Sequence, residues 1–587
     1  MTTQEAQRTR VCEGNYFTAG DGTQLFYRHW PAARERARGA VILFHRGHEH
    51  SGRLQHLVDE LDLSDFAVFA WDARGHGRST LCANPNPSLT TFVQDVDTFI
   101  RSVSEEHGIA IEDIAVLGQS VGSVLLATWV HDYAPRIRCM VLAAPAFKVK
   151  LYVPFARTFL AVWLRLFGDF QVNSYFKASA LTHDPERIAT YQSDPLIRRP
   201  ISAKVLLGLY STADRIVEDA HAIHAPTQLL ISGADWVVHR KPQERFFKNL
   251  GSKEKEKHIF PGFYHDTLGE KDRHLPVARA RAFILKHFTQ APEPICLLDA
   301  DQHGYTKDEF DSLVRRLPLY SPKGLHFRAL KLGMRTIGRL SKGIRTGVQT
   351  GFDSGSTLDY VYRNRVSGIT FAGRAMDWFF LNAVGWRGIR KRKENLERLL
   401  VRSIDMLRAA RRPVRVIDIA AGHGRYILSA LNARFNRQDR ALLRDYSAAN
   451  VERGRALIRE TGMEEIARFE QGDAFGRIEP EHNLAVVSGL YELFPENAPV
   501  LGSLQELAGA LEPGGYLVYT NQIWHPQLEM IAGSLTSHRK DKPWVMRRRT
   551  QAEIDQLVEA AGFRKIEQLT DEWGIFTVSL AQKITPF

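Results

Sequence analysis

Several features that would assign the chain to a particular class are absent or scarce. No run of about 18 uninterrupted apolar residues occurs, so a membrane-spanning helix is not expected. Residues 1–17 contain no apolar signal core, which disfavours export. The four cysteines, Cys12, Cys82, Cys139 and Cys296, show neither a paired metal spacing nor a disulfide framework. These absences predict a reduced, cytoplasmic protein without a bound metal.

What is present is the composition of a globular chain. The sequence has 587 residues, 44% of them hydrophobic and 25% charged, which excludes a disordered or fibrous protein and predicts two to four domains. The formal charge is +12 and is concentrated in the middle of the chain. Seven Lys or Arg and no Asp or Glu lie between Lys323 and Arg345. Such a surplus is compatible with nucleic acid, an anionic membrane or a solvated surface.

The N-terminal half alternates short β-rich runs with amphipathic segments, which predicts a mostly parallel α/β sheet. An apolar helical stretch at 152–170 interrupts this alternation after a strand end, where an inserted cap would lie. The strand candidates are 40–44, 67–71, 114–118, 139–144, 227–232 and 256–260.

A proline-containing boundary at 289–302 is followed by a helical, basic stretch and then by a second α/β alternation. Its strand candidates are 414–420, 441–446, 467–473, 483–489 and 515–521. We therefore expect three regions: an α/β domain at 15–288 with its cap at about 148–205, a basic helical connector at 289–400, and a second α/β domain at 401–587.

A nucleophile is predicted at the end of the strand expected at 114–118 in the N-terminal half. There Gly118-Gln119-Ser120-Val121-Gly122 precedes a helix. Small residues two positions before and after a serine permit a tight strand-turn-helix elbow, which holds the hydroxyl at a helix N-terminus. The motif alone is common by chance. Asp235 and His265, however, each follow a later strand, and a serine needs a base and an orienting acid. Ser120, Asp235 and His265 are therefore predicted to be catalytic.

Residues 20–288 resemble the monoacylglycerol-lipase and lysophospholipase branch of the α/β-hydrolases, which is also grouped with serine aminopeptidases. The matching stretches are GDGTQLFYRHW, EHSGR, WDARGHGRS, GQSVG, GADWVVH and GFYHD. The resemblance implies an oxyanion hole formed by the N–H groups of Gly47 and Val121. Arg46 stands where the branch has glycine, so we expect either an altered loop or a cation beside the site.

The cap stretch at 152–170 contains more large apolar residues than a surface helix needs. Two interpretations remain open: a helix packed on the sheet, or a groove for an acyl chain as in the related lipases. A peptidase is the competing activity, but no acid cluster suited to an amine is evident. We therefore expect an ester substrate of the monoacylglycerol or lysophospholipid type.

The second α/β region opens with a strand, a turn of small residues and a helix at 414–431. Asp418, Ala420, Gly422 and Gly424 follow the pattern Asp-x-Gly-x-Gly-x-Gly with alanine at the first glycine, and small residues let a ligand approach the backbone. A glycine-rich turn alone does not exclude a dehydrogenase.

Two later acids narrow this choice. Asp445 ends the second strand, where it can bond ribose hydroxyls, and Asp473 follows the third, where it can bond an adenine amine. With the late turn LEPGGYLVYTN, these residues resemble class I methyltransferases that use S-adenosyl-L-methionine. Tyr491, Glu492 and His525, with Asn521, lie near strand ends where an acceptor would bind, but no catalyst of methyl transfer is assigned.

The basic stretch at 324–349 has apolar residues three or four apart, which predicts a helix that docks on a domain or lies on an anionic membrane. These residues are Leu330, Met334, Ile337, Leu340, Ile344 and Val348. As a whole, the chain resembles bacterial proteins that join an α/β-hydrolase to a methyltransferase. The leading hypothesis is a bifunctional ester hydrolase and S-adenosyl-L-methionine-dependent methyltransferase. We expect the protein to be cytoplasmic, and a peripheral contact with the inner membrane face remains open. An RNA or small-molecule methyltransferase with an accessory esterase or peptidase, and a scaffold with one decayed site, are the alternatives.

Overall fold

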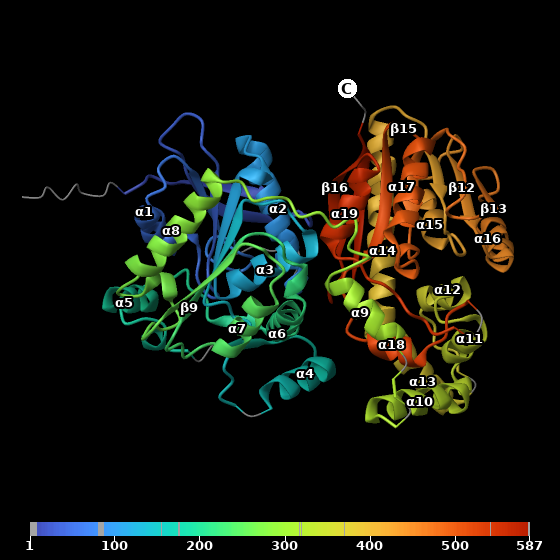
Figure 1. Cartoon of the computed structure of the whole chain (residues 1–587), viewed down its shortest axis with the longest axis horizontal. Coiled ribbons are helices and arrows are strands. Elements are labelled where there is room, and N and C mark those ends of the chain that lie inside the picture. Colours follow the sequence, from blue (N-terminus) through green and yellow to red (C-terminus); the bar gives the residue numbers. More distant parts are fainter. Residues whose placement is uncertain are drawn as a thin grey trace, which may run out of the picture. The chain divides into compact units, whose positions relative to one another are not determined.

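The computed structural model describes residues 9–79, 87–153, 155–173, 176–315, 317–318, 320–368, 370–539 and 542–584. The chain divides into two units, Met1–Ile295 and Cys296–Phe587 (Figure 1). Cys12, Cys139 and Cys296 carry free thiols, and Cys82 lies outside the described residues. Within the described ranges, no helix combines the length and the apolarity needed to cross a bilayer.

The first unit is built on an eight-stranded sheet in the order β1-β2-β4-β3-β5-β6-β9-β10. β1 and β2 pair antiparallel, as do β2 and β4, and the remaining neighbours are parallel. All six expected strands are confirmed to within one residue at each end, whereas the antiparallel β1 and β2 were not expected. The strands are β1 (Glu13–Thr18), β2 (Gln24–Trp30), β3 (Ala40–Phe44), β4 (Ala67–Trp71), β5 (Ile114–Gln119), β6 (Cys139–Ala143), β9 (Thr227–Ser232) and β10 (Lys255–Phe260).

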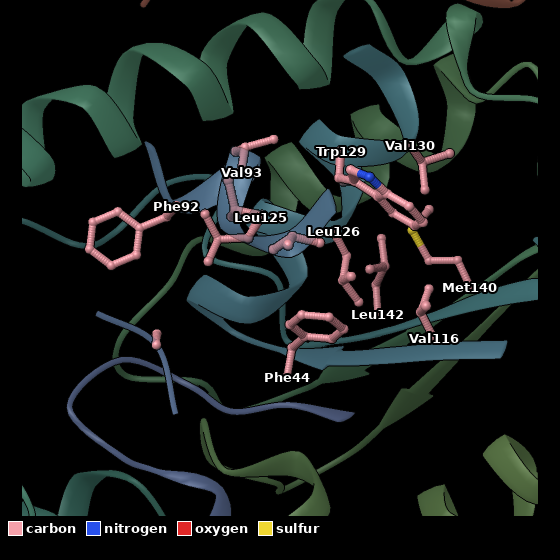
Figure 2. Packing of buried hydrophobic residues seen from close by; sticks show 14 of the residues in the cluster. Phe44, Phe92, Val93, Val116, Leu125, Leu126, Trp129, Val130, Met140 and Leu142 are labelled. Carbon is pink, nitrogen blue, oxygen red and sulfur yellow. The ribbon is translucent and has the colours of Figure 1, made fainter. Parts of the chain in front are cut away.

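Helices cover both faces of this sheet, which explains why its central strands are apolar throughout. In β3 every residue is buried, and alternate side chains enter two different clusters. Ile42 and Phe44 pack with α2 and α3 (Figure 2), whereas Val41 and Leu43 pack with α1 and α8. The helices of this unit outside the cap are α1 (Gln55–Leu61), α2 (Leu89–His107), α3 (Val121–Tyr133), α7 (Arg240–Asn249) and α8 (His274–Thr289).

A cap is inserted between β6 and β9, at the carboxyl end of the sheet. It consists of α4 (Ala156–Phe167), α5 (Pro185–Ser193), α6 (Ala203–Glu218) and the short pair β7 (Gln171–Asn173) and β8 (Pro200–Ser202). The apolar stretch at 152–170 is thus confirmed as helical. None of the side chains in α4 is buried, because the helix contacts the rest of the unit mainly through α6.

The second unit contains a seven-stranded sheet in the order β13-β12-β11-β14-β15-β17-β16. β17 is antiparallel to both of its neighbours, and the other pairs are parallel. The five expected strands are confirmed, and the antiparallel pair at the C-terminal edge was not expected. The strands are β11 (Arg415–Asp418), β12 (Arg440–Asp445), β13 (Ala467–Gln471), β14 (His482–Val487), β15 (Leu511–Gln522), β16 (Phe563–Thr570) and β17 (Phe576–Lys583).

Helices precede this sheet and alternate with its strands, as in a Rossmann-like domain. The long α14 contacts β17 and α15, and it supplies Leu396, Leu399 and Leu400 to the core on that face. The helices are α9 (Tyr305–Val314), α10 (Pro322–Arg335), α11 (Lys342–Thr350), α12 (Gly355–Arg363), α13 (Phe371–Leu381), α14 (Val384–Ala409), α15 (Arg425–Ala433), α16 (Ala448–Glu460), α17 (Asn497–Ala510), α18 (Leu528–Ser534) and α19 (Gln551–Ala560).

The basic stretch at 324–349 is not one helix. α10 ends at Arg335, a 3-10 turn η6 (Ile337–Leu340) follows, and α11 begins at Lys342. Gly343 and Gly347 are buried, and a Cβ on either would lie within 2.6 Å of a phenylalanine ring. These glycines form a packing face, while the apolar residues expected to form a ridge are partly exposed, Ile337 to 65%. The expectation of a single amphipathic helix is therefore wrong.

Candidate active sites

Ser120 occupies a strained elbow between β5 and α3. Its backbone has φ 54° and ψ −112°, a region that non-glycine residues rarely adopt. The two flanking glycines are required by space: a Cβ on Gly118 would lie 2.8 Å from the backbone of Gly122, and one on Gly122 would lie 2.6 Å from the carbonyl oxygen of Phe44. The elbow therefore depends on the sequence Gly-x-Ser-x-Gly.

The structure brings together the three residues predicted to be catalytic. His265 Nε2 lies 2.8 Å from Ser120 Oγ, and His265 Nδ1 lies 2.8 Å from Asp235 Oδ2. The other oxygen of Asp235 accepts N–H bonds from Val237 and Val238 at 2.7 and 2.9 Å. Burial alone would raise the pKa of Asp235, but His265 and the two N–H groups lower it below its ordinary value. This arrangement suits a base-activated serine.

The loop after β3 carries the residues expected to form the oxyanion hole. A Cβ on Gly47 would lie 3.3 Å from Val121 Cγ2, so the two residues are neighbours. The N–H of Val121 is the first of α3, where no intrahelical acceptor exists. The positive φ in this loop, 70°, falls on His48 rather than on Arg46.

Arg46 does not provide a free cation beside the nucleophile. Its guanidinium bonds Glu49 at 2.8 Å and lies 3.5 Å from Asp266, and all three side chains are buried. Burial opposes its charge, but the two carboxylates raise the pKa of Arg46 above its ordinary value. The expectation of a cation available to an acidic headgroup is therefore wrong, because Arg46 is held between two buried carboxylates, one of which, Asp266, is remote in the sequence.

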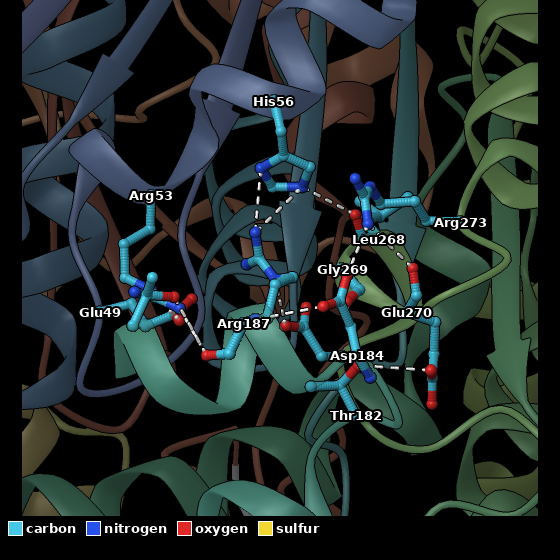
Figure 3. Close-up of polar contacts among 12 residues, drawn as sticks. Glu49, Arg53, His56, Thr182, Asp184, Arg187, Leu268, Gly269, Glu270 and Arg273 are labelled. Carbon is cyan, nitrogen blue, oxygen red and sulfur yellow. Dashed lines mark hydrogen bonds and ion pairs between the residues drawn. The ribbon is translucent and has the colours of Figure 1, made fainter. Parts of the chain in front are cut away.

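A polar network fixes the segment that carries His265 (Figure 3). Asp266 accepts a bond from Gln119 at 2.8 Å and pairs with Arg187 of the cap helix α5 at 3.2 Å. Arg187 also bonds His56 at 3.0 Å. Burial acts against the charge of Asp266, yet Arg46 and Arg187 hold its pKa well below the ordinary value. The network thereby ties the cap to the loop on which the base stands.

A cavity of about 980 Å³ opens at Ser120 and His265. Its polar lining is sparse, and its walls come from α2, α3 and the cap. Large apolar side chains line it, including Phe92, Leu125, Phe159, Phe176, Val205 and Leu209. The space and its apolar walls suit an acyl chain.

In the second unit, the small-residue turn lies between β11 and α15. Gly422 and Gly424 have φ values of 58° and 74°, so both need the freedom of glycine. A Cβ on Gly422 would meet no atom closer than 3.9 Å, which leaves its backbone open to a ligand. Asp445 Oδ2 accepts the N–H of Gly422 at 2.9 Å, so the acid that ends β12 is adjacent to this turn.

Of the residues expected to bind a cofactor, Ala420, Gly422 and Gly424 line a cavity of about 40 Å³. Asp418 is fully buried behind the turn, and its Oδ1 accepts the N–H of Ala420 at 3.2 Å. Asp473 is exposed, and its carboxylate accepts the N–H of Phe475.

Sequence reasoning missed the residues of α12 that cover this turn. Asp359 and Tyr362 line the cavity, and Asp359 pairs with Arg425 at 2.6 Å. No signal in the sequence connects an acid in the region expected to be a basic connector, 289–400, with an arginine 66 positions later.

A further cavity of about 90 Å³ lies next to the cavity of about 40 Å³ at this turn, because Leu358 and Arg392 line both. Glu492 and His525, expected near an acceptor, line it. Tyr491 and Asn521 do not: the former bonds Ser503 and the latter bonds a backbone carbonyl.

Comparisons with known proteins agree with this division. A family model described as "Serine aminopeptidase, S33" matches residues 35–272, and one described as "Putative methyltransferase" matches residues 280–583. The first unit is an α/β-hydrolase domain with a lipase-like sequence, and the second is a Rossmann-like methyltransferase domain. The chain belongs to the methyltransferase family whose model spans residues 280–583.

Three relatives and structures illustrate the likeness. The uncharacterized protein YnbC of Escherichia coli (strain K12) is 53% identical over 98% of this chain and 99% of that protein. The monoacylglycerol lipase of Mycolicibacterium smegmatis is 26% identical over 46% of this chain and 96% of its own length. The crystal structure of Paleococcus ferrophilus monoacylglycerol lipase is 25% identical, covers 45% of this chain and 99% of that chain, and has a TM-score of 0.41.

Proposed function

We propose that the protein is a bifunctional enzyme that hydrolyses a lipid-like ester, of monoacylglycerol or lysophospholipid type, and transfers a methyl group from S-adenosyl-L-methionine. The observation that supports the first activity best is the 2.8 Å contact between Ser120 Oγ and His265 Nε2 at the mouth of a cavity of about 980 Å³. The apolar walls favour an ester with an acyl chain over a peptide, although the matching family model is described by an aminopeptidase.

In the proposed hydrolysis, Ser120 attacks the ester carbonyl while His265 takes the hydroxyl proton and returns it to the leaving alcohol. A water that gives a proton to His265 then attacks the acyl group on Ser120, and His265 returns this proton to Ser120 as the acid leaves. Asp235 fixes the imidazole so that Nδ1 carries a proton and Nε2 accepts one. The N–H groups of Gly47 and Val121 would stabilise the negative charge that develops on the carbonyl oxygen.

For the second activity, the turn and its neighbouring acid fit a nucleoside cofactor. The backbone of Gly422 is open, Gly424 is the N-cap residue of α15, and the carboxylate of Asp445 accepts the N–H of Gly422. These residues would hold S-adenosyl-L-methionine, which supplies an electrophilic methyl group when bound. The remaining task of the protein is alignment and exclusion of water.

A peripheral contact with an anionic membrane is proposed for the second unit. η6 packs against both α10 and α13, and large apolar side chains are exposed there: Leu332 to 63%, Ile337 to 65% and Phe371 to 89%. Arg335 and Arg339 add positive charge. The sequences of α10, η6, α11 and α13 contain one acidic residue, Asp377, and its side chain is buried. Such a surface suits anionic lipid.

Two measurements test the bifunctional proposal. Fluorophosphonate labelling of the purified protein should modify Ser120, and titration calorimetry should detect S-adenosyl-L-methionine. A screen of lipid extracts with and without this cofactor would then identify the substrates. Cleavage of aminoacyl amides in preference to esters would overturn the hydrolase part, and binding of a nicotinamide cofactor in place of S-adenosyl-L-methionine would overturn the other.

A further inference from the structure

The cavity of about 90 Å³ in the second unit adjoins the small-residue turn through Leu358 and Arg392, which line both spaces. At about 15 Å³ for one water, it has room for roughly six waters, or for a small polar group with a few carbons. Its walls are largely apolar and aromatic, and the rings of Trp386 and Trp544 stack with centroids 6.0 Å apart. Within the methyltransferase proposal, this is the position for a methyl acceptor.

The polar groups that this cavity leaves unsatisfied are hydrogen-bond donors. Trp544 Nε1, Arg392 Nε and Gln522 Nε2 are buried and find no acceptor within the described part of the chain. The indole and guanidinium nitrogens can only donate. Since a buried donor without a partner costs about 1–3 kcal/mol, such groups indicate a ligand that accepts.

His525 adds another donor. Its Nδ1 accepts the N–H of Gln527 at 3.0 Å, and burial lowers the pKa of its imidazole to about 4. The ring is therefore neutral at pH 7 with its proton on Nε2, and it cannot take a proton from a ligand through that nitrogen.

The two carboxylates that line the cavity, Asp353 and Glu492, each have a partner in the protein. Glu492 Oε1 lies 3.4 Å from a guanidinium nitrogen of Arg392. Asp353 accepts the hydroxyl of Ser537 at 2.6 Å and pairs with His538 at 3.0 Å. An ammonium group would meet the positive charge of Arg392 and the N–H donors, and it would have to share Glu492 with Arg392 and Asp353 with Ser537 and His538.

We propose that this cavity binds the methyl acceptor and that the acceptor is a carboxylate on an apolar body. The proposal rests on the methyltransferase activity proposed above. An alcohol or an ammonium must lose a proton to be methylated, and neither His525 nor the paired Glu492 is placed to remove one. A carboxylate is already ionised at neutral pH and requires no base.

The reaction is balanced without a proton. A carboxylate oxygen forms a bond to the methyl carbon while the sulfur–carbon bond of the sulfonium donor breaks, which leaves a methyl ester and a neutral thioether. The class of reaction that supplies such an acceptor is ester hydrolysis, which is also the activity proposed for the first unit. The two steps together exchange the alcohol of an ester for methanol.

The test uses the full-length Ser120→Ala protein, so that a methyl ester is not hydrolysed after it forms. The chain has 10 tryptophans, and none of them lines the larger cavity of the first unit, so the indole N–H signal that is lost in Trp544→Phe reports on the cavity of the second unit. In a ¹⁵N-tryptophan spectrum, hexanoate should shift the signal that Trp544→Phe removes. Trp544→Phe should weaken hexanoate binding about tenfold.

Two further variants complete the design. Trp573→Phe is the matched control, because Trp573 packs in the same apolar cluster but does not line the cavity, and it should bind hexanoate as before. Gln522→Met removes a donor at nearly constant size and should also weaken hexanoate binding. It therefore keeps the test decisive if the Trp544→Phe protein does not fold. With labelled S-adenosyl-L-methionine, mass spectrometry should detect methyl hexanoate.

The outcomes separate the two proposals. A Trp544 signal that responds to hexylamine or hexanol at lower concentration than to hexanoate would overturn the carboxylate assignment, as would unchanged binding in Trp544→Phe. Failure of S-adenosyl-L-methionine to bind the same protein in calorimetry would overturn the methyltransferase proposal instead, whatever hexanoate does.

Discussion

Each unit buries an aspartate side chain close to the carboxyl end of a strand, yet the pKa values of the two side chains are shifted in opposite directions. Asp235 accepts two backbone N–H bonds and contacts His265, so its pKa is lowered despite burial. Asp418 accepts one backbone N–H at 3.2 Å, and the hydroxyl of Tyr426 faces its carboxyl group. Burial therefore raises the pKa of Asp418 to about 7, and the nearby charge of Asp445 adds to the shift.

The two sites also differ in how far their buried polar groups are hydrogen-bonded within the protein. Around Ser120 each member of the proposed triad is bonded in the absence of a substrate. Around the small-residue turn, His423 Nε2 and Arg392 Nε are buried without a partner in the described chain. Unsatisfied buried groups are costly, so the second site is expected to gain order and stability from its ligands more than the first.

The largest expected effect tests the completeness of the first site. Ser120→Ala should lower ester cleavage by roughly 10⁴-fold or more and abolish fluorophosphonate labelling, because the attacking oxygen is lost. The rate of ester hydrolysis and the labelled peptide are the measurements. Ser123→Ala is the matched control, since Ser123 lies one turn further along α3 and bonds only backbone carbonyls. Labelling of the Ser120→Ala protein at the wild-type rate would contradict the assignment.

The contributions of Asp418 and Asp235 to the free energy of unfolding should change with pH in opposite directions. The folded-state pKa of Asp418, about 7, exceeds that of an unfolded aspartate, so its contribution is complete below about pH 4 and is lost as the pH rises through 7. Asp418→Asn cannot ionise, and at pH 8 it should be more stable than wild type by at most about 4 kcal/mol. Calorimetric unfolding at pH 5 and pH 8 measures the difference.

Asp235→Asn is the counterpart, and its effect should have the reverse sign. The lowered pKa of Asp235 gives stability that is present above about pH 4 and is lost as the pH falls through the folded-state value. This variant should therefore be less stable than wild type at pH 8. Equal shifts of both variants in the same direction would remove the proposed contrast.

What the sequence could predict follows from how parallel sheets are built. Strands buried on both faces are continuous apolar runs, and their carboxyl ends meet at one edge, so Ser120, Asp235 and His265 could be placed together from strand ends alone. The pairing of Arg46 with Asp266 could not, because the two residues are 220 positions apart. Glycine has a low helix propensity, and only the packed Phe380 and Phe352 rings show that Gly343 and Gly347 of α11 are contact positions.

The cofactor site offers a smaller effect that distinguishes two of its expected acids. Asp445→Ala should weaken S-adenosyl-L-methionine binding about ten- to hundredfold, because Asp445 is bonded to the turn through Gly422. Asp473→Ala should change it less, since this side chain is exposed and accepts the N–H of Phe475 rather than an N–H of the turn. Titration calorimetry of both variants measures the ratio, and a greater loss in Asp473→Ala would reverse the assignment.

The smallest expected effect concerns the surfaces of the two units. α4 exposes Phe159 to 61% and Leu166 to 68%, and its Arg157 is paired with Asp214. In the second unit the exposed apolar residues of α10 and η6 lie among cations, so only this surface should bind vesicles in a salt-dependent way. Neutralising Arg335, Arg339 and Lys342 to Gln should weaken co-sedimentation with anionic vesicles several-fold at low salt, and little at physiological salt, because salt screens the attraction between surface cations and anionic lipid. Neutralising Arg437, Arg468 and Arg477, which removes the same charge elsewhere, should have no such effect. Equal sedimentation of the two triple variants would exclude the membrane contact proposed for this surface.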